Sequence, residues 1–151
     1  MSLQARTVVA RLLLAPLSVA YLVAVGWMTL TVRPYGEDIG GVVDRLLAWL
    51  SRRPLTEWVT FAWLEFLANI AMFVPLGVFV VLWFGVRRWW LAPLIGFAVS
   101  ALIELCQLLF LPTRYPDTRD LLANTAGAVL GAAVMILLWF LLTSAPARRR
   151  R

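Results

Sequence analysis

The chain of 151 residues contains no histidine, no lysine and a single cysteine. Without histidine it cannot form the Ser-His or Cys-His pairs that activate nucleophiles, and it cannot carry a phosphohistidine. Cys106 lies within an apolar run, and one thiol cannot build a disulfide framework or a thiolate metal site within a single chain. These absences exclude several common classes of enzyme and every metal site made of several thiolates from one chain.

Charged residues are also scarce, at 15% against 62% hydrophobic residues, and the mean hydropathy is +0.85. A soluble domain has about one quarter charged residues and is about half apolar. The apolar residues gather in four runs, at about 12–32, 58–86, 89–111 and 121–142. Each run is long enough, as a helix, to cross a hydrocarbon core of about 30 Å. The sequence therefore predicts an all-α membrane protein in which a single domain, 1–151, forms a four-transmembrane-helix bundle.

Two of the predicted segments had alternatives. The first run is interpreted as an uncleaved span, because its apolar stretch exceeds the roughly 7–15 residues of a signal-peptide core. In the first outer loop, apolar residues recur at helical spacing from Val42 to Leu50, with arginines among and beyond them. This pattern predicts a short amphipathic helix, which either lies on the membrane surface or folds over the end of the bundle.

Basic residues are distributed unequally between the two sides of the predicted bundle. The net charge is +6, but the arginines lie at the ends of the spans, which indicates membrane topology and not nucleic-acid binding. One side collects arginines without any acidic residue: Arg6, Arg11, Arg87, Arg88 and Arg148–Arg151. The positive-inside rule therefore predicts a multi-pass protein of the cell inner or plasma membrane with both termini in the cytoplasm.

Three of the predicted spans each carry a pair of polar residues. The pairs are Glu65 with Asn69, Glu104 with Gln107, and Asp120 with Asn124. The members of each pair are three or four residues apart, so they share one face of a helix. With the predicted topology, all of them lie in the outer half of the bilayer. Because such groups are costly in hydrocarbon, we expect them to meet in one polar site that opens outward.

An ordered set of motifs runs through the same spans. It consists of Asn69-x-x-x-Phe73-x-Pro75-Leu76-Gly77, Glu104-x-x-Gln107, Arg114, and Arg119-Asp120-x-x-x-Asn124-x-x-Gly127-x-x-x-Gly131. This set resembles the pattern of VanZ-like membrane proteins, in the family's order, from about residue 65 to 131. The resemblance implies a small bacterial helical membrane protein. The founding member is associated with resistance to teicoplanin-type glycopeptides by a route that does not remodel the peptidoglycan terminus. The resemblance supports the helical fold and the membrane location better than it supports any particular reaction.

The charged residues of the expected site admit two interpretations each. Arg114 and Arg119 could hold a phosphate or carboxylate of an outer-leaflet lipid, since guanidinium groups suit bidentate anions, or they could pair with Asp117 and Asp120 in a rigid loop. Asp120 could be a general base or a helix cap. Glu104 should be protonated or paired within its apolar span, which suits either an acid or proton-relay role or a structural ion pair with an arginine.

The remaining polar residues also have structural alternatives. Asn69, Gln107 and Asn124 are most simply interhelical hydrogen-bonding groups, with ligand binding as the less favoured role. Glu65 either points into the site or reaches interfacial water. Gly127 and Gly131 are expected to serve helix packing. No metal or other cofactor is required by the pattern.

Two hypotheses about function follow. In the first, the site binds or modifies an anionic cell-envelope lipid, with Glu104 and Asp120 as catalytic acid and base and with Arg114, Arg119, Asn69, Gln107, Asn124 and Glu65 as ligand-binding residues. In the second, the protein is a non-enzymatic scaffold or modulator whose polar residues only hold the helices together. Membrane lipids are the expected partners, and a homo-oligomer is compatible with either hypothesis.

Overall fold

The computed structural model describes residues 3–31, 37–111 and 117–144, and these contain helices and turns but no strand. The elements are α1 (Leu3–Leu30), α2 (Glu37–Leu50), α3 (Phe61–Phe84), the short 3-10 turn η1 (Val86–Arg88), α4 (Leu91–Phe110) and α5 (Thr118–Ser144). Within the described ranges, four helices are long and apolar enough to cross a membrane, and α2 is the additional short helix. The predicted all-α membrane fold is confirmed.

The helices α1 and α5 both start before the spans that were predicted for them. Helix α1 begins at Leu3, well before the predicted start at residue 12, although the apolar part remains Leu12–Leu30. Helix α5 begins at Thr118, before the predicted start at 121. Hydropathy detects the segment in contact with hydrocarbon, whereas a helix continues until a cap or a turn ends it.

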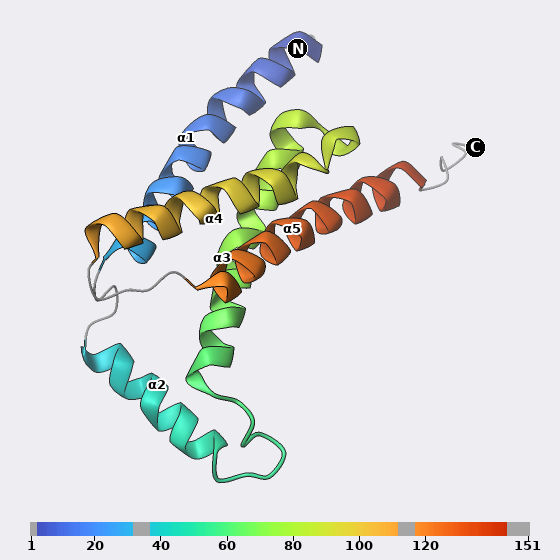
Figure 1. Cartoon of the computed structure of the whole chain (residues 1–151). Helices are drawn as coiled ribbons and strands as arrows, with labels where there is room; N and C mark the ends of the chain where they lie inside the picture. The colour runs from blue at the N-terminus through green and yellow to red at the C-terminus, as the bar shows by residue number, and fades with distance from the viewer. Residues whose placement is uncertain (1–2, 32–36, 112–116, 145–151) are drawn as a thin grey trace.

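Helices α3 and α5 share the most extensive contact of the described chain, and α4 packs against the same α5 (Figure 1). Figure 1 shows α4 and α5 running alongside each other while α3 crosses them. The completely buried Phe73 of α3 lies in this region. Most other large apolar side chains are exposed on the outer surface, as expected of helices that face lipid.

Three glycines make the contact between α3 and α5 possible. A Cβ atom on Gly77 would collide with the backbone carbonyl of Ala128 in α5. On the other side, a Cβ atom on Gly127 would collide with the carbonyl of Ile70, and one on Gly131 with the carbonyl of Val74. The two backbones therefore touch directly, which is the arrangement that small residues allow between membrane helices. The prediction that Gly127 and Gly131 serve packing agrees with these contacts.

Helices α1 and α2 lie at the periphery. From Leu12 onward, where the side chains of α1 are described, Val25 is the buried one, and it packs with Phe73 and Leu76 of α3. Towards its N-terminal end α1 diverges from the other helices (Figure 1). Helix α2 stands apart, with no extensive contact to the long helices. Of its two predicted placements, folding over the end of the bundle is therefore not observed.

The ends of the helices define two sides. The N-terminal end of α1, the η1 turn and the C-terminal end of α5 lie on one side of the molecule (Figure 1). The C-terminal ends of α1 and α4 and the N-terminal end of α5 lie on the opposite side. We call these the η1 side and the α5-start side. The predicted polar residues therefore belong to the α5-start side.

Candidate functional site

The first turn of α5 is organised by Asp117. Its Oδ1 accepts a hydrogen bond from the backbone N–H of Arg119 at 2.8 Å, which is the bond of a helix N-cap. Its own backbone N–H donates to Glu104 Oε2 of α4 at 3.1 Å. The cap that the sequence had offered as an alternative for Asp120 is thus supplied by Asp117, and Glu104 fixes the capping residue to α4.

Asp120 faces α3 instead. Asn69 Nδ2 donates to Asp120 Oδ1 at 2.7 Å, so the two residues join the N-terminal turns of α5 to the middle of α3. Both side chains are half-buried. This contact brings together two residues that the sequence had placed in one site although 51 positions separate them.

A second polar layer lies one turn deeper. Asn124 Nδ2 donates to Ser100 Oγ of α4 at 2.8 Å, and both residues are buried, at 4% and 0% exposure. Asn124 Oδ1 has no hydrogen-bond partner among the described residues. The sequence analysis did not select Ser100. Its spacing held a signal, since Ser100, Glu104 and Gln107 stand at i, i+4 and i+7 on one helix face.

Gln107 is directed towards α1. Its Nε2 donates to the backbone carbonyl of Thr29 at 2.9 Å, and the side chain is 6% exposed. The contact ties the C-terminal end of α1 to α4. Thr29 was also missed, and no residue pattern could have revealed it, because the acceptor is a backbone carbonyl that every residue carries.

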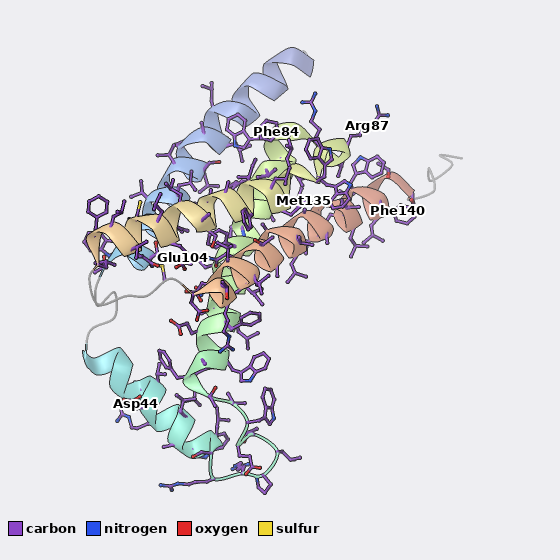
Figure 2. The ribbon with its side chains drawn as sticks, in the orientation of Figure 1. Asp44, Phe84, Arg87, Glu104, Met135 and Phe140 are labelled. Carbon is purple, nitrogen blue, oxygen red and sulfur yellow. The ribbon has the colours of Figure 1, made fainter. Side chains whose placement is uncertain are left out.

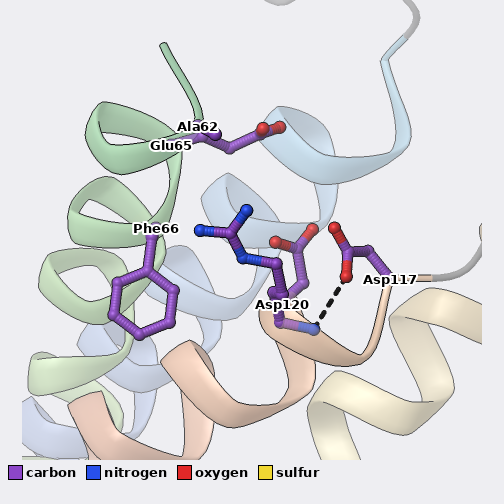
Figure 3. A pocket seen from close by; sticks show the side chains of 6 residues that line it. Ala62, Glu65, Phe66, Asp117 and Asp120 are labelled. Carbon is purple, nitrogen blue, oxygen red and sulfur yellow. Dashed lines mark hydrogen bonds between the residues drawn. The ribbon is translucent and has the colours of Figure 1, made fainter. Parts of the chain in front are cut away.

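A small open pocket lies at the start of α5, between α5 and α3 (Figure 3). It has a volume of about 40 Å³ and is lined by Ala62, Glu65 and Phe66 of α3 and by Asp117, Arg119 and Asp120. We call it the α5 pocket. Figure 3 shows Asp117 just before α5 and Asp120 in its first turn close together, with Glu65 extending from α3. Of the predicted site residues, Glu65, Arg119 and Asp120 line this pocket, whereas Asn69, Glu104, Gln107 and Asn124 do not.

The charges in the α5 pocket are unequal. Three carboxylates and one guanidinium line it. Glu65, Asp117 and Arg119 are exposed and Asp120 is half-buried. Asp117 accepts from the backbone N–H of Arg119, and Asp120 has a further interaction besides its bond with Asn69, so the alternative of a rigid loop of paired arginines and aspartates stays open. Arg114 lies outside the described residues.

The polar side chains do not resemble a metal centre. Within the described ranges, no group of three or more histidine, cysteine, aspartate or glutamate residues is arranged to hold a metal ion. The α5 pocket contains acidic side chains, but two of them are committed to hydrogen bonds, Asp117 with Arg119 N–H and Asp120 with Asn69.

Comparison with known protein families identifies a relationship for most of the chain. The model of the VanZ/LLP1 family matches residues 18–141. No curated protein and no solved structure matches. The matched region includes all of α3 and α4, the C-terminal part of α1, most of α5 and the residues that line the α5 pocket. The resemblance inferred from the motifs is confirmed, and this multi-pass membrane protein belongs to the VanZ/LLP1 family.

Proposed function

We propose that the α5 pocket binds the anionic headgroup of a cell-envelope amphiphile. The observation that carries this proposal is the position of Arg119. It is exposed in the first turn of α5 and lines the pocket beside the exposed side chains of Glu65 and Asp117. A guanidinium group at a helix N-terminus combines a full positive charge with the positive end of the helix dipole, and both favour a phosphate or carboxylate.

The acidic residues narrow the class of headgroup. Glu65 and Asp117 are exposed at the same pocket and accept hydrogen bonds but cannot donate them when ionised. A headgroup bearing only anionic groups would be repelled by them. The lining therefore suits an amphiphile whose headgroup joins an anionic group, for Arg119, to hydroxyl or amine donors, for the carboxylates.

The geometry supports binding better than catalysis by a pair of carboxylates. Asp120 lines the α5 pocket, but Glu104 does not, and Glu104 is engaged with the backbone of Asp117. An acid and a base that act on one substrate must both reach it. Glu104 serves the site in this arrangement by holding the residue that caps α5, and Asp120 is the remaining candidate for a general base.

The pocket is proposed to open at the outer face of the membrane. It lies at the α5-start side, opposite the η1 side where Arg87 and Arg88 are exposed. The positive-inside rule assigns an arginine-rich side to the cytoplasm. With this orientation, a headgroup of the outer leaflet reaches Arg119 without crossing the membrane.

The scaffold hypothesis has an observation of its own. Each of the three amide side chains bridges two helices: Asn69 joins α3 to α5, Asn124 joins α5 to α4, and Gln107 joins α4 to α1. Such bonds stabilise membrane helices whether or not a ligand is present. They do not involve the Arg119 guanidinium, and this separates the two hypotheses experimentally.

The test compares Arg119→Ala with Arg52→Ala, an exposed arginine of the segment that follows α2. The purified protein is examined in mild detergent by native mass spectrometry, and folding is followed by thermal melting. We expect wild type and Arg52→Ala to retain a co-purified amphiphile that Arg119→Ala loses while melting normally. Unchanged retention in Arg119→Ala would contradict the proposal and favour the scaffold.

A cellular measurement extends the same comparison. If the VanZ-type phenotype applies to this protein, expression should lower susceptibility to teicoplanin, and Arg119→Ala should remove the effect while Arg52→Ala preserves it. An effect that survives in Arg119→Ala would separate glycopeptide protection from the α5 pocket.

A further inference from the structure

A second concave surface lies far from the α5 pocket, between α1 and the C-terminal half of α3. This groove has a volume of about 180 Å³, and almost all of its surface is apolar. Its lining includes Tyr21 and Leu22 of α1 and Leu76, Phe79, Trp83 and Phe84 of α3. We call it the α1–α3 groove. It exists because α1 diverges from α3 towards the η1 side (Figure 1).

The polar atoms beside the groove are bonded within the protein. Trp83 Nε1 donates to Ser18 Oγ at 3.1 Å, and Ser18 Oγ donates to the carbonyl of Leu14 at 2.8 Å. Tyr21 Oη donates to the carbonyl of Met72 at 2.7 Å. With these groups satisfied, the groove offers hydrocarbon and aromatic surface only. Its lining residues all belong to the membrane-spanning segments, so the surrounding medium is lipid.

Positive charge lies at one end of the groove. Arg87 and Arg88 follow α3 in the η1 turn and are exposed. They follow Phe84 within four residues, across Gly85, where α3 ends and the chain turns. Figure 2 shows Phe84 and Arg87 together at this end of α3. Trp89 and Trp90 are exposed beside the arginines, at 45% and 51%, and exposed tryptophans are typical of the headgroup level of a bilayer.

We propose that the α1–α3 groove and the Arg87-Arg88 pair together bind one anionic phospholipid of the leaflet on the η1 side. One acyl chain lies in the groove against Leu76, Phe79 and Phe84, and the phosphate contacts the two arginines. The groove runs from Leu76 to Phe84, about 12 Å along the helix, which accommodates a section of one acyl chain. The lipid fills the wedge that α1 leaves open, and it is distinct from the ligand proposed for the α5 pocket.

Charge complementarity decides the class of occupant. The described residues of the η1 turn and its neighbours include no acidic group, in contrast to the three carboxylates of the α5 pocket. A zwitterionic lipid gains little from two adjacent arginines, whereas each basic residue near the membrane surface strengthens binding of an anionic lipid. A second protein helix is a poorer occupant, because bulky aromatic residues line the groove where close helix packing requires small ones.

The experiment titrates the purified full-length protein with phosphatidylglycerol or phosphatidylcholine and counts bound lipids by native mass spectrometry. We expect one phosphatidylglycerol molecule that the wild type and Arg119→Ala both bind in preference to phosphatidylcholine, because Arg119→Ala removes from the count any phosphatidylglycerol held in the α5 pocket. Arg87→Ala/Arg88→Ala should bind it roughly 30-fold more weakly, from two basic contacts at the membrane surface. The matched control is Arg52→Ala/Arg53→Ala, a second adjacent pair of exposed arginines within the described part of the chain, which should bind as the wild type does.

A second pair of variants tests the groove itself. Leu22→Trp places bulk into the groove, and Val23→Trp places the same bulk on the neighbouring position of α1, which is 66% exposed and does not line the groove. Leu22→Trp should lose the lipid and Val23→Trp should keep it. Equal binding of both lipids, normal binding by Arg87→Ala/Arg88→Ala, or equal loss in Arg52→Ala/Arg53→Ala would overturn the proposal. Arg119→Ala should retain this lipid, because Arg119 lines the α5 pocket and not the α1–α3 groove.

Discussion

Helix α5 contacts α3 in one way, and helix α1 contacts α3 and α4 in another. Between α3 and α5 the backbones meet directly, with Gly77, Gly127 and Gly131 opposite main-chain atoms of the partner helix. Between α1 and its neighbours the contact runs through long side chains, such as Tyr21 and Gln107, whose polar ends bond to carbonyls. Since lipid is as apolar as a leucine side chain, burial alone cannot drive either association.

The difference shows where the structure can tolerate change. A contact between backbones has no rotamer to adjust, so an added methyl group forces the helices apart. A contact through side chains can lose one bond and keep its shape. We expect the α3–α5 pair to determine whether the protein folds, and α1 to adapt to the lipid beside it.

Adding a methyl group at a glycine of α5 and at a glycine of α1 should change the stability of the protein by the most different amounts. In Gly131→Ala the new Cβ would meet the Val74 carbonyl and the Val78 amide nitrogen, and neither backbone atom can move alone. We expect destabilisation of about 3 kcal/mol or more, at or above the upper end of overpacking costs. Thermal melting in detergent measures it.

Gly26→Ala in α1 is the control for that measurement. Nothing lies within 4 Å of a Cβ atom at Gly26, so the substitution should be neutral or slightly stabilising, because alanine favours a helix. Similar melting of Gly131→Ala and Gly26→Ala would show that the backbones of α3 and α5 are not in direct contact.

Removing one amide from each region should have intermediate effects. Asn69→Leu deletes the donor to the Asp120 carboxylate, while Gln107→Leu deletes a donor to the neutral Thr29 carbonyl. Hydrogen bonds to charged groups contribute about 1.5–3 kcal/mol and neutral ones about 0.5–1.5 kcal/mol. Asn69→Leu should therefore lower the melting temperature more than Gln107→Leu. The reverse order would indicate that α1 is held more firmly than the start of α5.

Removing a single hydroxyl group should have the smallest effect. Tyr21→Phe deletes the bond from α1 to the Met72 carbonyl and should cost about 0.6 kcal/mol, an average value for interhelical bonds in a membrane. Thr143→Val removes a hydroxyl that bonds only within its own helix, to the carbonyls of Trp139 and Phe140. It should have no measurable effect, and a loss as large as that of Tyr21→Phe would show that the Met72 bond contributes nothing.

The sequence predicted the long apolar helices and the polar residues that lie within them. The four apolar runs predicted the spans, and Asn69 and Asp120 were placed in one site because each belongs to a polar pair in the outer half of the bilayer. Gly127 and Gly131 were predicted to form a packing surface because they share one helix face and small residues let helices approach closely.

Other features depend on where the chain turns, and the residue pattern did not contain that information. Asp117, not Asp120, caps α5, because the helix starts before its apolar run does. Gln107 shares a helix face with Ser100, yet it bonds to α1 and not to the residues around the α5 pocket. The first outcome depends on where α5 starts and the second on how α1 lies against α4, and hydropathy and spacing leave both undetermined.

The two residues that bond α3 to α5 are made at different times during synthesis of the chain. Asn69 and Asp120 are 51 residues apart, and all of α4 is made between them. At about 5–20 residues per second, α3 leaves the ribosome roughly 3–10 s before the partner of Asn69 exists. During that interval the face of α3 around Gly77 and the Asn69 amide must be held by the insertion machinery or by lipid. The order of translation therefore makes α5 the helix whose insertion completes the fold.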